Sequence, residues 1–66
     1  MKNTLKVERA KLNMTQQELA DQISVSRQTI NSIESQKYIP STVLALKISK
    51  VFNTSVNDIF ELENED

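Results

Sequence analysis

The sequence predicts a small all-α fold of five helices, with room for one tiny antiparallel strand pair between the two ends of the chain. Residues that favour helix starts precede apolar residues at helical spacing, and this combination recurs along the chain. The 66 residues include no glycine, so the helices must end at residues of other types. At this length we expect one domain, spanning residues 1–66.

The composition limits the chemistry open to the chain. Cysteine and histidine are absent, which excludes disulfides, thiolate metal sites and the usual proton shuttle. We therefore expect no enzyme, no metal and no cofactor, and no small-molecule ligand because no second domain could house a pocket. No apolar run approaches the roughly 18 residues of a membrane span. With no signal-peptide pattern at the start either, we expect a cytoplasmic protein without a membrane partner.

The charges are distributed unevenly. All eight Lys and Arg residues lie in residues 1–50 with four acidic residues, which makes that part +4. Residues 51–66 hold five acidic residues and no basic one, which makes that part −5. A basic body of this kind suits a polyanionic partner. Taken alone, the acidic end is explained more simply as a solubilising terminus.

A first helix is expected over about residues 4–12, after three polar residues that either fray or form a short strand. Arg9 lies on the same side of this helix as the apolar Leu5 and Leu12, so its charge needs a partner. Four residues occupy positions where helix-ending glycines are usual, and the sequence leaves open which of them adopt the left-handed conformation. These four are Asn13, Ser24, Gln36 and Asn53.

The stretch from Thr15 to Glu34 predicts two short helices around a tight break. Thr15 and Glu18 form the pattern of a capping box, in which each side chain bonds a backbone amide at the helix start. Ser26 follows the break and is a good cap for the second helix. The inward residues of the two helices are Leu19, Ala20, Ile23, Ile30 and Ile33. This pattern is a helix-turn-helix motif over about residues 16–35.

The second helix of this motif has a polar outward arc. At a 3.6-residue period the arc contains Arg27, Gln28, Asn31, Ser32 and Ser35. Guanidinium and amide side chains can make forked hydrogen bonds to base edges in the DNA major groove. From the residues alone, a solvated helix face explains the arc equally well.

The rest of the chain predicts a loop and two helices. Pro40 ends the loop, Ser41 or Thr42 caps a helix over about residues 42–52, and Ser55 opens the last one. Apolar residues occupy most of the circumference of the 42–52 helix, so we expect it to be the most buried element. The last apolar residues form one set, of which some must belong to the core and part is a candidate dimer interface. The set is Phe52, Ile59, Phe60 and Leu62.

Several segments together resemble the XRE-type (Cro and phage-repressor) helix-turn-helix family. They are Arg9, Thr15–Ala20, Val25–Ile30, Ile33–Glu34, Pro40–Ser41, Leu46, Phe52–Ser55 and Ile59–Phe60. The similarity covers residues 4–60, and the combination of Thr-Gln-x-x-Leu-Ala with Ser-Arg-Gln-Thr-Ile is specific. The chain looks most like compact, stand-alone dimeric repressors of the cytolysin-repressor type. The resemblance implies a five-helix, lambda-repressor-like DNA-binding domain.

The resemblance also implies roles for individual residues. Arg27, Gln28 and Asn31 match positions that read bases. Gln16, Ser26, Thr29, Lys37 and Tyr38 match positions that contact DNA phosphates. Arg9 and Glu34 match a structural ion pair, which would give Arg9 the partner it needs. Two departures are Ser24 in place of a turn glycine and Glu8 in place of an apolar residue.

The leading hypothesis is a sequence-specific transcriptional repressor that binds a palindromic operator in double-stranded DNA as a homodimer, through the major groove. An antitoxin of a toxin–antitoxin pair with the same DNA-binding domain is the alternative. A third class is an interaction module that has lost DNA binding, against which the set of Arg27, Gln28, Asn31 and Lys37 argues.

Overall fold

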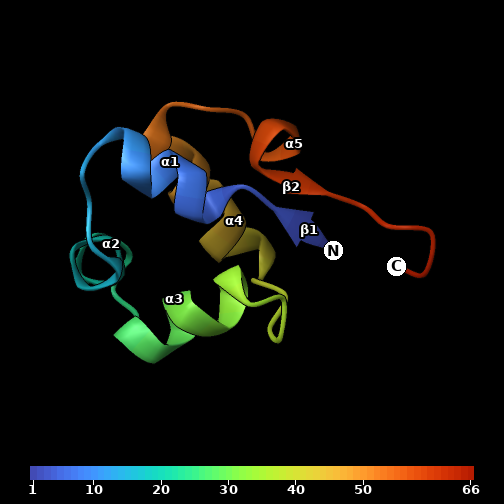
Figure 1. The fold of residues 1–66 in the computed structure, drawn as a ribbon, viewed down its shortest axis with the longest axis horizontal. Coiled ribbons are helices and arrows are strands. Elements are labelled where there is room, and N and C mark those ends of the chain that lie inside the picture. The colour runs from blue at the N-terminus through green and yellow to red at the C-terminus, as the bar shows by residue number, and fades with distance from the viewer.

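The computed structural model describes residues 1–66 and contains five helices and one two-stranded sheet (Figure 1). The elements are β1 (Lys2–Asn3), α1 (Leu5–Lys11), α2 (Gln16–Ile23), α3 (Arg27–Glu34), α4 (Thr42–Phe52), α5 (Val56–Ile59) and β2 (Phe60–Glu61). The strands are antiparallel, with Lys2 opposite Glu61 and Asn3 opposite Phe60. The predicted helix count and terminal strand pair are therefore confirmed. None of the helices is long and apolar enough to cross a lipid bilayer.

Side-chain caps start three of the helices. At α2, Thr15 Oγ1 accepts from the Glu18 amide at 3.0 Å and Glu18 Oε1 accepts from the Thr15 amide at 2.9 Å, so the predicted capping box forms. The hydroxyls of Ser26 and Ser41 cap α3 and α4 by accepting from the amides of Thr29 and Leu44, without a reciprocal bond. Ser55, also predicted to cap, makes no such bond before the single turn of α5.

Helices α1 to α4 all end through a residue in the left-handed conformation. Asn13, Ser24, Gln36 and Asn53 have φ of 52°, 60°, 63° and 49°. After each of them the next amide bonds a carbonyl five residues back, as in Lys37 to Ser32 at 2.9 Å. This closes the helix end and turns the chain sharply. All four residues thus adopt a conformation that glycine usually takes at helix ends, and the Cβ of each makes that conformation sterically less favourable.

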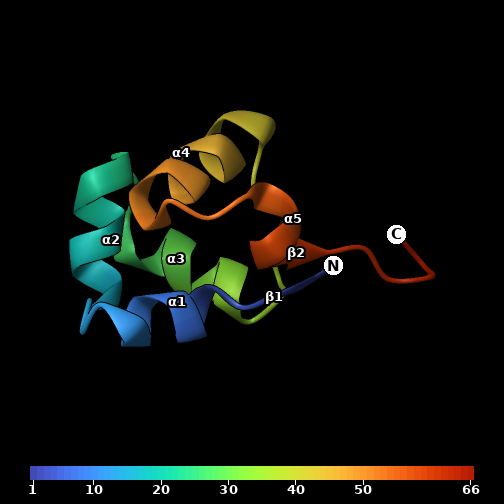
Figure 2. The same cartoon turned by 90° about the horizontal axis from the view of Figure 1, so that it is seen from above.

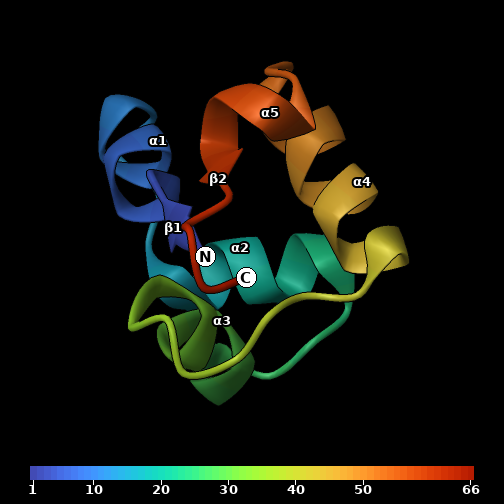
Figure 3. The same ribbon diagram turned by 90° about the vertical axis from the view of Figure 1, so that its right-hand side faces the viewer.

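Helix α2 lies at the centre and contributes three of the nine buried apolar side chains. Figure 3 shows α1 and α4 on opposite sides of it, with α3 beneath. The core consists of Leu5, Leu19, Ala20, Ile23, Ile30, Ile33, Ile48, Ile59 and Phe60. The prediction that α4 is the most buried element is wrong. Only Ile48 of α4 is fully buried, because this helix packs by one face on α2 and α5 and leaves Val43 and Leu46 exposed.

The two ends of the chain lie together at one end of the molecule (Figure 2). The α-amino group of Met1 lies 3.0 Å from Glu63 Oε1 and 3.1 Å from Asp66 Oδ1. Hydrogen bonds to Glu63 and Asp66 raise the pKa of this amine above its ordinary value. The side chain of Asn3 reaches the other way and donates to the Ile33 carbonyl at 2.9 Å, which ties β1 to the end of α3.

The left-handed helix ends predict opposite effects for two chemically identical substitutions. Ser24→Gly removes a Cβ at φ 60°, so we expect the free energy of unfolding to rise by up to about 1 kcal/mol. Ser35→Gly changes a residue at φ −82°, where glycine adds flexibility to the unfolded chain and also removes the hydrogen bond from the Ser35 hydroxyl to the Asn31 carbonyl. We expect it to lower the free energy of unfolding by about 0.5–1 kcal/mol. Urea titrations of both variants measure this, and equal changes of one sign would contradict it.

Candidate nucleic-acid interface

Helix α3 lies at the edge of the fold (Figure 1), and its polar side faces solvent. Ile30 and Ile33 are buried beneath it, whereas Arg27, Gln28 and Asn31 are exposed. We call these three side chains the α3 face. Because the two isoleucines anchor the opposite side of the helix, the α3 face is held outward on a rigid element.

The expected phosphate-contacting residues surround the α3 face. Ser26 Oγ accepts from the Thr29 amide at 3.1 Å and lies 2.9 Å from the Thr29 hydroxyl, so the two hydroxyls sit together at the start of α3. Lys37 and Tyr38 follow the other end of α3 and are exposed. Their amides bond the Ser32 carbonyl at 2.9 and 3.3 Å, which holds this loop against the helix.

A hollow of about 440 Å³ lies beside α3 and joins several of these residues. It is lined by Val25, Ser26, Gln28, Thr29, Ser32, Tyr38 and Leu44. Neither Val25 nor Leu44 was expected at the site, because Val25 lies in the break between the two helices and Leu44 belongs to the apolar pattern of the 42–52 helix. Both are half-exposed and line the same hollow as Gln28, which depends on the tertiary structure.

The ion pair between Arg9 and Glu34 joins α1 to α3. Arg9 Nε donates to Glu34 Oε2 at 2.6 Å and Nη2 donates to Oε1 at 3.0 Å, a bidentate contact. Nη1 donates to the Met14 carbonyl at 2.7 Å. The two side chains are only 13% and 7% exposed. This contact supplies the partner that Arg9 was predicted to need.

Glu34 stays ionised because its hydrogen bonds outweigh its burial. Burial alone pushes its pKa upward, but the bonds from Arg9 and Gln16 bring the pKa below its ordinary value. Gln16 Nε2 donates to Glu34 Oε1 at 3.0 Å and to Asn31 Oδ1 at 3.4 Å. Gln16, expected at a phosphate, is therefore half-buried at the start of α2 and tied to α3.

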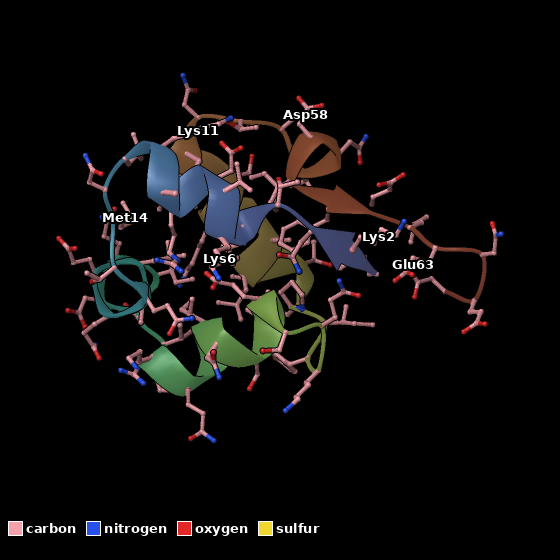
Figure 4. The ribbon with its side chains drawn as sticks, in the orientation of Figure 1. Lys2, Lys6, Lys11, Met14, Asp58 and Glu63 are labelled. Atoms are coloured by element: carbon pink, nitrogen blue, oxygen red, sulfur yellow. The ribbon has the colours of Figure 1, made fainter.

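Figure 4 shows where several charged side chains lie, with Lys2 close to Glu63 at the end of the molecule that holds the two termini. Lys6 of α1 lies near α3, close enough for its charge to help lower the pKa of Glu34. Asp58 and Glu63 lie at the end formed by α5 and the residues after β2. The acidic C-terminal residues thus lie away from the α3 face, although Lys2 and the Met1 amine lie among them.

The C-terminal residues expected at a dimer interface separate into two groups. Ile59 and Phe60 belong to the core, because the chain changes from helix to strand between them and both side chains turn inward. They are thus among the core residues that this set was expected to contain. Phe52 is half-buried, and Leu62 is 77% exposed.

The ion pair predicts a specific loss of stability at neutral pH. A lowered carboxyl pKa stabilises the fold above the ordinary value of 4.5, and this contribution disappears as pH falls through the folded-state pKa. We expect Glu34→Gln to lower the free energy of unfolding by about 2 kcal/mol at neutral pH, and by less in acid. Urea titrations at both pH values measure this against the exposed Glu65→Gln. Equal losses from the two variants would contradict it.

Comparisons with known proteins agree with this geometry. The helix-turn-helix family model matches residues 5–59. The chain is 52% identical over 66 residues to an uncharacterised HTH-type transcriptional regulator of Methanocaldococcus jannaschii, covering 100% of both chains. It is 45% identical over 65 residues to another, YgzD of Bacillus subtilis, covering 98% of each.

A solved structure has the same fold. The SOS-response transcriptional repressor LexA from Eubacterium rectale superposes with a TM-score of 0.80 at 31% identity, over 94% of this chain and 66% of that one. The family model and the two regulators span nearly the whole of the present chain. The chain belongs to the XRE-type helix-turn-helix family that its sequence resembles.

Proposed function

We propose that this protein is a sequence-specific DNA-binding transcriptional regulator that acts in the cytoplasm as a homodimeric repressor on a palindromic operator. The observation that carries the proposal is the α3 face, in which Arg27, Gln28 and Asn31 project from a helix anchored by a buried ion pair and two isoleucines. The regulators to which the chain is similar bear HTH-type names.

The side chains of the α3 face suit direct readout in the major groove. A guanidinium binds guanine N7 and O6 in a fork, and an amide binds adenine N6 and N7 in the same manner. The hydroxyls of Ser26 and Thr29 and the loop carrying Lys37 and Tyr38 flank this face, at the two ends of α3. Such flanking donors bind phosphates and set the register of the protein on the duplex.

A second hollow, which is mostly apolar and lies at the start of α4, supports the homodimer. It measures about 360 Å³ and is lined by Met1, Ile39, Pro40, Thr42, Ala45, Leu46, Val56 and Phe60. Of the lining residues, Leu46 is 58% exposed and Ile39 is 61% exposed, and the nearby Val43 is exposed as well. Contiguous apolar surface of this kind commonly marks a protein contact. A homodimer that binds two half-sites one duplex turn apart needs its two α3 faces about 34 Å from each other.

Selection from random DNA with the purified protein tests the proposed function. We expect one enriched palindromic sequence whose half-sites lie about one helical turn apart. Enrichment of no sequence would overturn the proposal. Enrichment of a single half-site would overturn the homodimer while leaving sequence-specific binding in place.

Two substitutions at different places on the interface predict different kinds of loss. Gln28→Ala removes a forked base contact, so we expect affinity for the selected site to fall by about 1–3 kcal/mol with little change for unrelated DNA. Lys37→Ala removes a phosphate contact, so we expect weaker binding to all sequences and a slope of log K against log salt smaller by about one. Fluorescence anisotropy titrations over a salt series measure both. Indistinguishable behaviour of the two variants would contradict the assignments.

The apolar hollow predicts that a charge within it produces monomers. We expect Leu46→Glu to convert the dimer to a monomer in sedimentation velocity and to weaken operator binding by roughly 100-fold, because two linked half-sites reinforce each other. Val7→Glu on α1 is the matched control, since Val7 is 53% exposed and lies outside the hollow. A dimer that survives in Leu46→Glu would place the interface elsewhere.

A further inference from the structure

Gln16 connects the buried ion pair to the α3 face. Its Nε2 donates to Glu34 Oε1 at 3.0 Å and to Asn31 Oδ1 at 3.4 Å, while Glu34 also accepts from Arg9. One side-chain nitrogen therefore uses both of its hydrogens, one toward a carboxylate and one toward a side chain of the α3 face. The contacts run without interruption from Arg9 on α1 to Asn31 on α3.

The carboxylate decides which way the Gln16 amide points. An ionised carboxylate has no hydrogen to donate, so a neighbouring amide can bind it only through nitrogen. Glu34 receives the Arg9 guanidinium on both oxygens and is charged at neutral pH. Turning the Gln16 carbonyl oxygen toward Glu34 would set two acceptors against each other. The Gln16 nitrogen is consequently held on the side of α3.

The same logic then fixes the next amide. The free hydrogen on Gln16 Nε2 requires an acceptor, and Asn31 provides its Oδ1. The Asn31 nitrogen must then lie on the opposite side of its own amide group, away from α2. Asn31 is exposed, so that nitrogen is directed toward whatever covers the α3 face.

We propose that Gln16 is a positioning residue that holds Asn31 with its oxygen toward α2 and its nitrogen toward DNA, so that Asn31 favours a base edge offering an acceptor. Guanine and adenine N7 and thymine O4 are such acceptors, whereas cytosine offers only an amino donor. The inference rests on the proposed function. It adds a determinant of specificity that itself need not touch a base.

A positioning role differs measurably from a phosphate contact by Gln16. Loss of a phosphate contact weakens binding to every sequence by a similar factor, whereas release of the Asn31 amide changes the preference at one base pair. Gln16→Met keeps the length of the side chain and removes both donated hydrogen bonds. Gln17→Met is the matched control, because Gln17 donates one bond to Asp21 Oδ1 at 2.9 Å within α2 and faces solvent.

The test is a binding profile over all single-base variants of the selected operator. Asn31→Ala identifies the base pair that Asn31 reads, as the position at which preference disappears. We expect Gln16→Met to reduce the preference at this same position at least about fivefold, with no further effect in the Asn31→Ala background. Gln17→Met should leave the profile unchanged. A uniform loss of affinity in Gln16→Met, with every preference intact, would overturn the positioning role.

Two further measurements keep the proposal testable if Gln16→Met folds poorly or no operator is found. Asn31→Asp retains the acceptor toward Gln16 but replaces the outward nitrogen by an oxygen, so we expect its preference to move toward cytosine. An unchanged base preference would overturn the proposal. In the DNA-free protein, we expect the Asn31 side-chain amide resonances to shift in Gln16→Met and not in Gln17→Met. Absence of that shift would also overturn the positioning role, whether or not the protein selects a DNA site.

Discussion

The carboxylate of Glu34 is the group on which the rest of the structure depends. It stands at the end of α3 and accepts hydrogen bonds from Arg9 of α1 and Gln16 of α2, so three helices meet at one charge. Such a largely buried ion pair fixes the relative orientation of the helices more than it adds to the free energy of unfolding, because desolvation of the two charges offsets much of their attraction. Its directional bonds set the angle of α3 against α1 and α2, and with it the direction in which the α3 face points.

The chain obtains its sharp turns without glycine. Four residues other than glycine take the left-handed conformation, and each ends a helix. The amide of the residue that follows each of them donates to a carbonyl in the last turn of that helix. At Gln36 this closure places Lys37 and Tyr38 against the end of α3, so the backbone that stops the helix also builds the edge of the candidate interface. Asn tolerates this conformation better than most residues, which suits Asn13 and Asn53 to it.

The loop between α3 and α4 separates two surfaces of different character. Tyr38 lines the hollow beside the α3 face, and the next residue, Ile39, lines the apolar hollow at the start of α4. A partner that contacts Ile39 and Pro40 would thus touch the same loop whose preceding residues, Lys37 and Tyr38, are hydrogen-bonded to Ser32 of α3. The proposed dimer contact and the proposed DNA contact are neighbours along the backbone, although they face different ways.

Local signals in the sequence determined most of the secondary structure and much of the site. The capping box at Thr15, the cap at Ser26 and the inward isoleucines of α3 depend on neighbouring residues, so pattern and spacing were enough to predict them. The same periodicity predicted which side of α3 carries Arg27, Gln28 and Asn31. The pairing of Arg9 with Glu34 followed only from a family resemblance, since no local rule relates residues 25 positions apart.

Tertiary packing decided what local patterns could not. Helix α4 is apolar around most of its circumference, yet only the placement of α2 and α5 determines that Ile48 is covered and Leu46 is not. Ile59 and Phe60 turn inward because the chain passes from helix to strand between them, which depends on β1 pairing with β2 from the other end of the chain. Gln16 reaches Glu34 and Asn31 because α2 and α3 cross at this point. Periodicity predicts the faces of a helix, but which face is covered depends on elements distant in sequence.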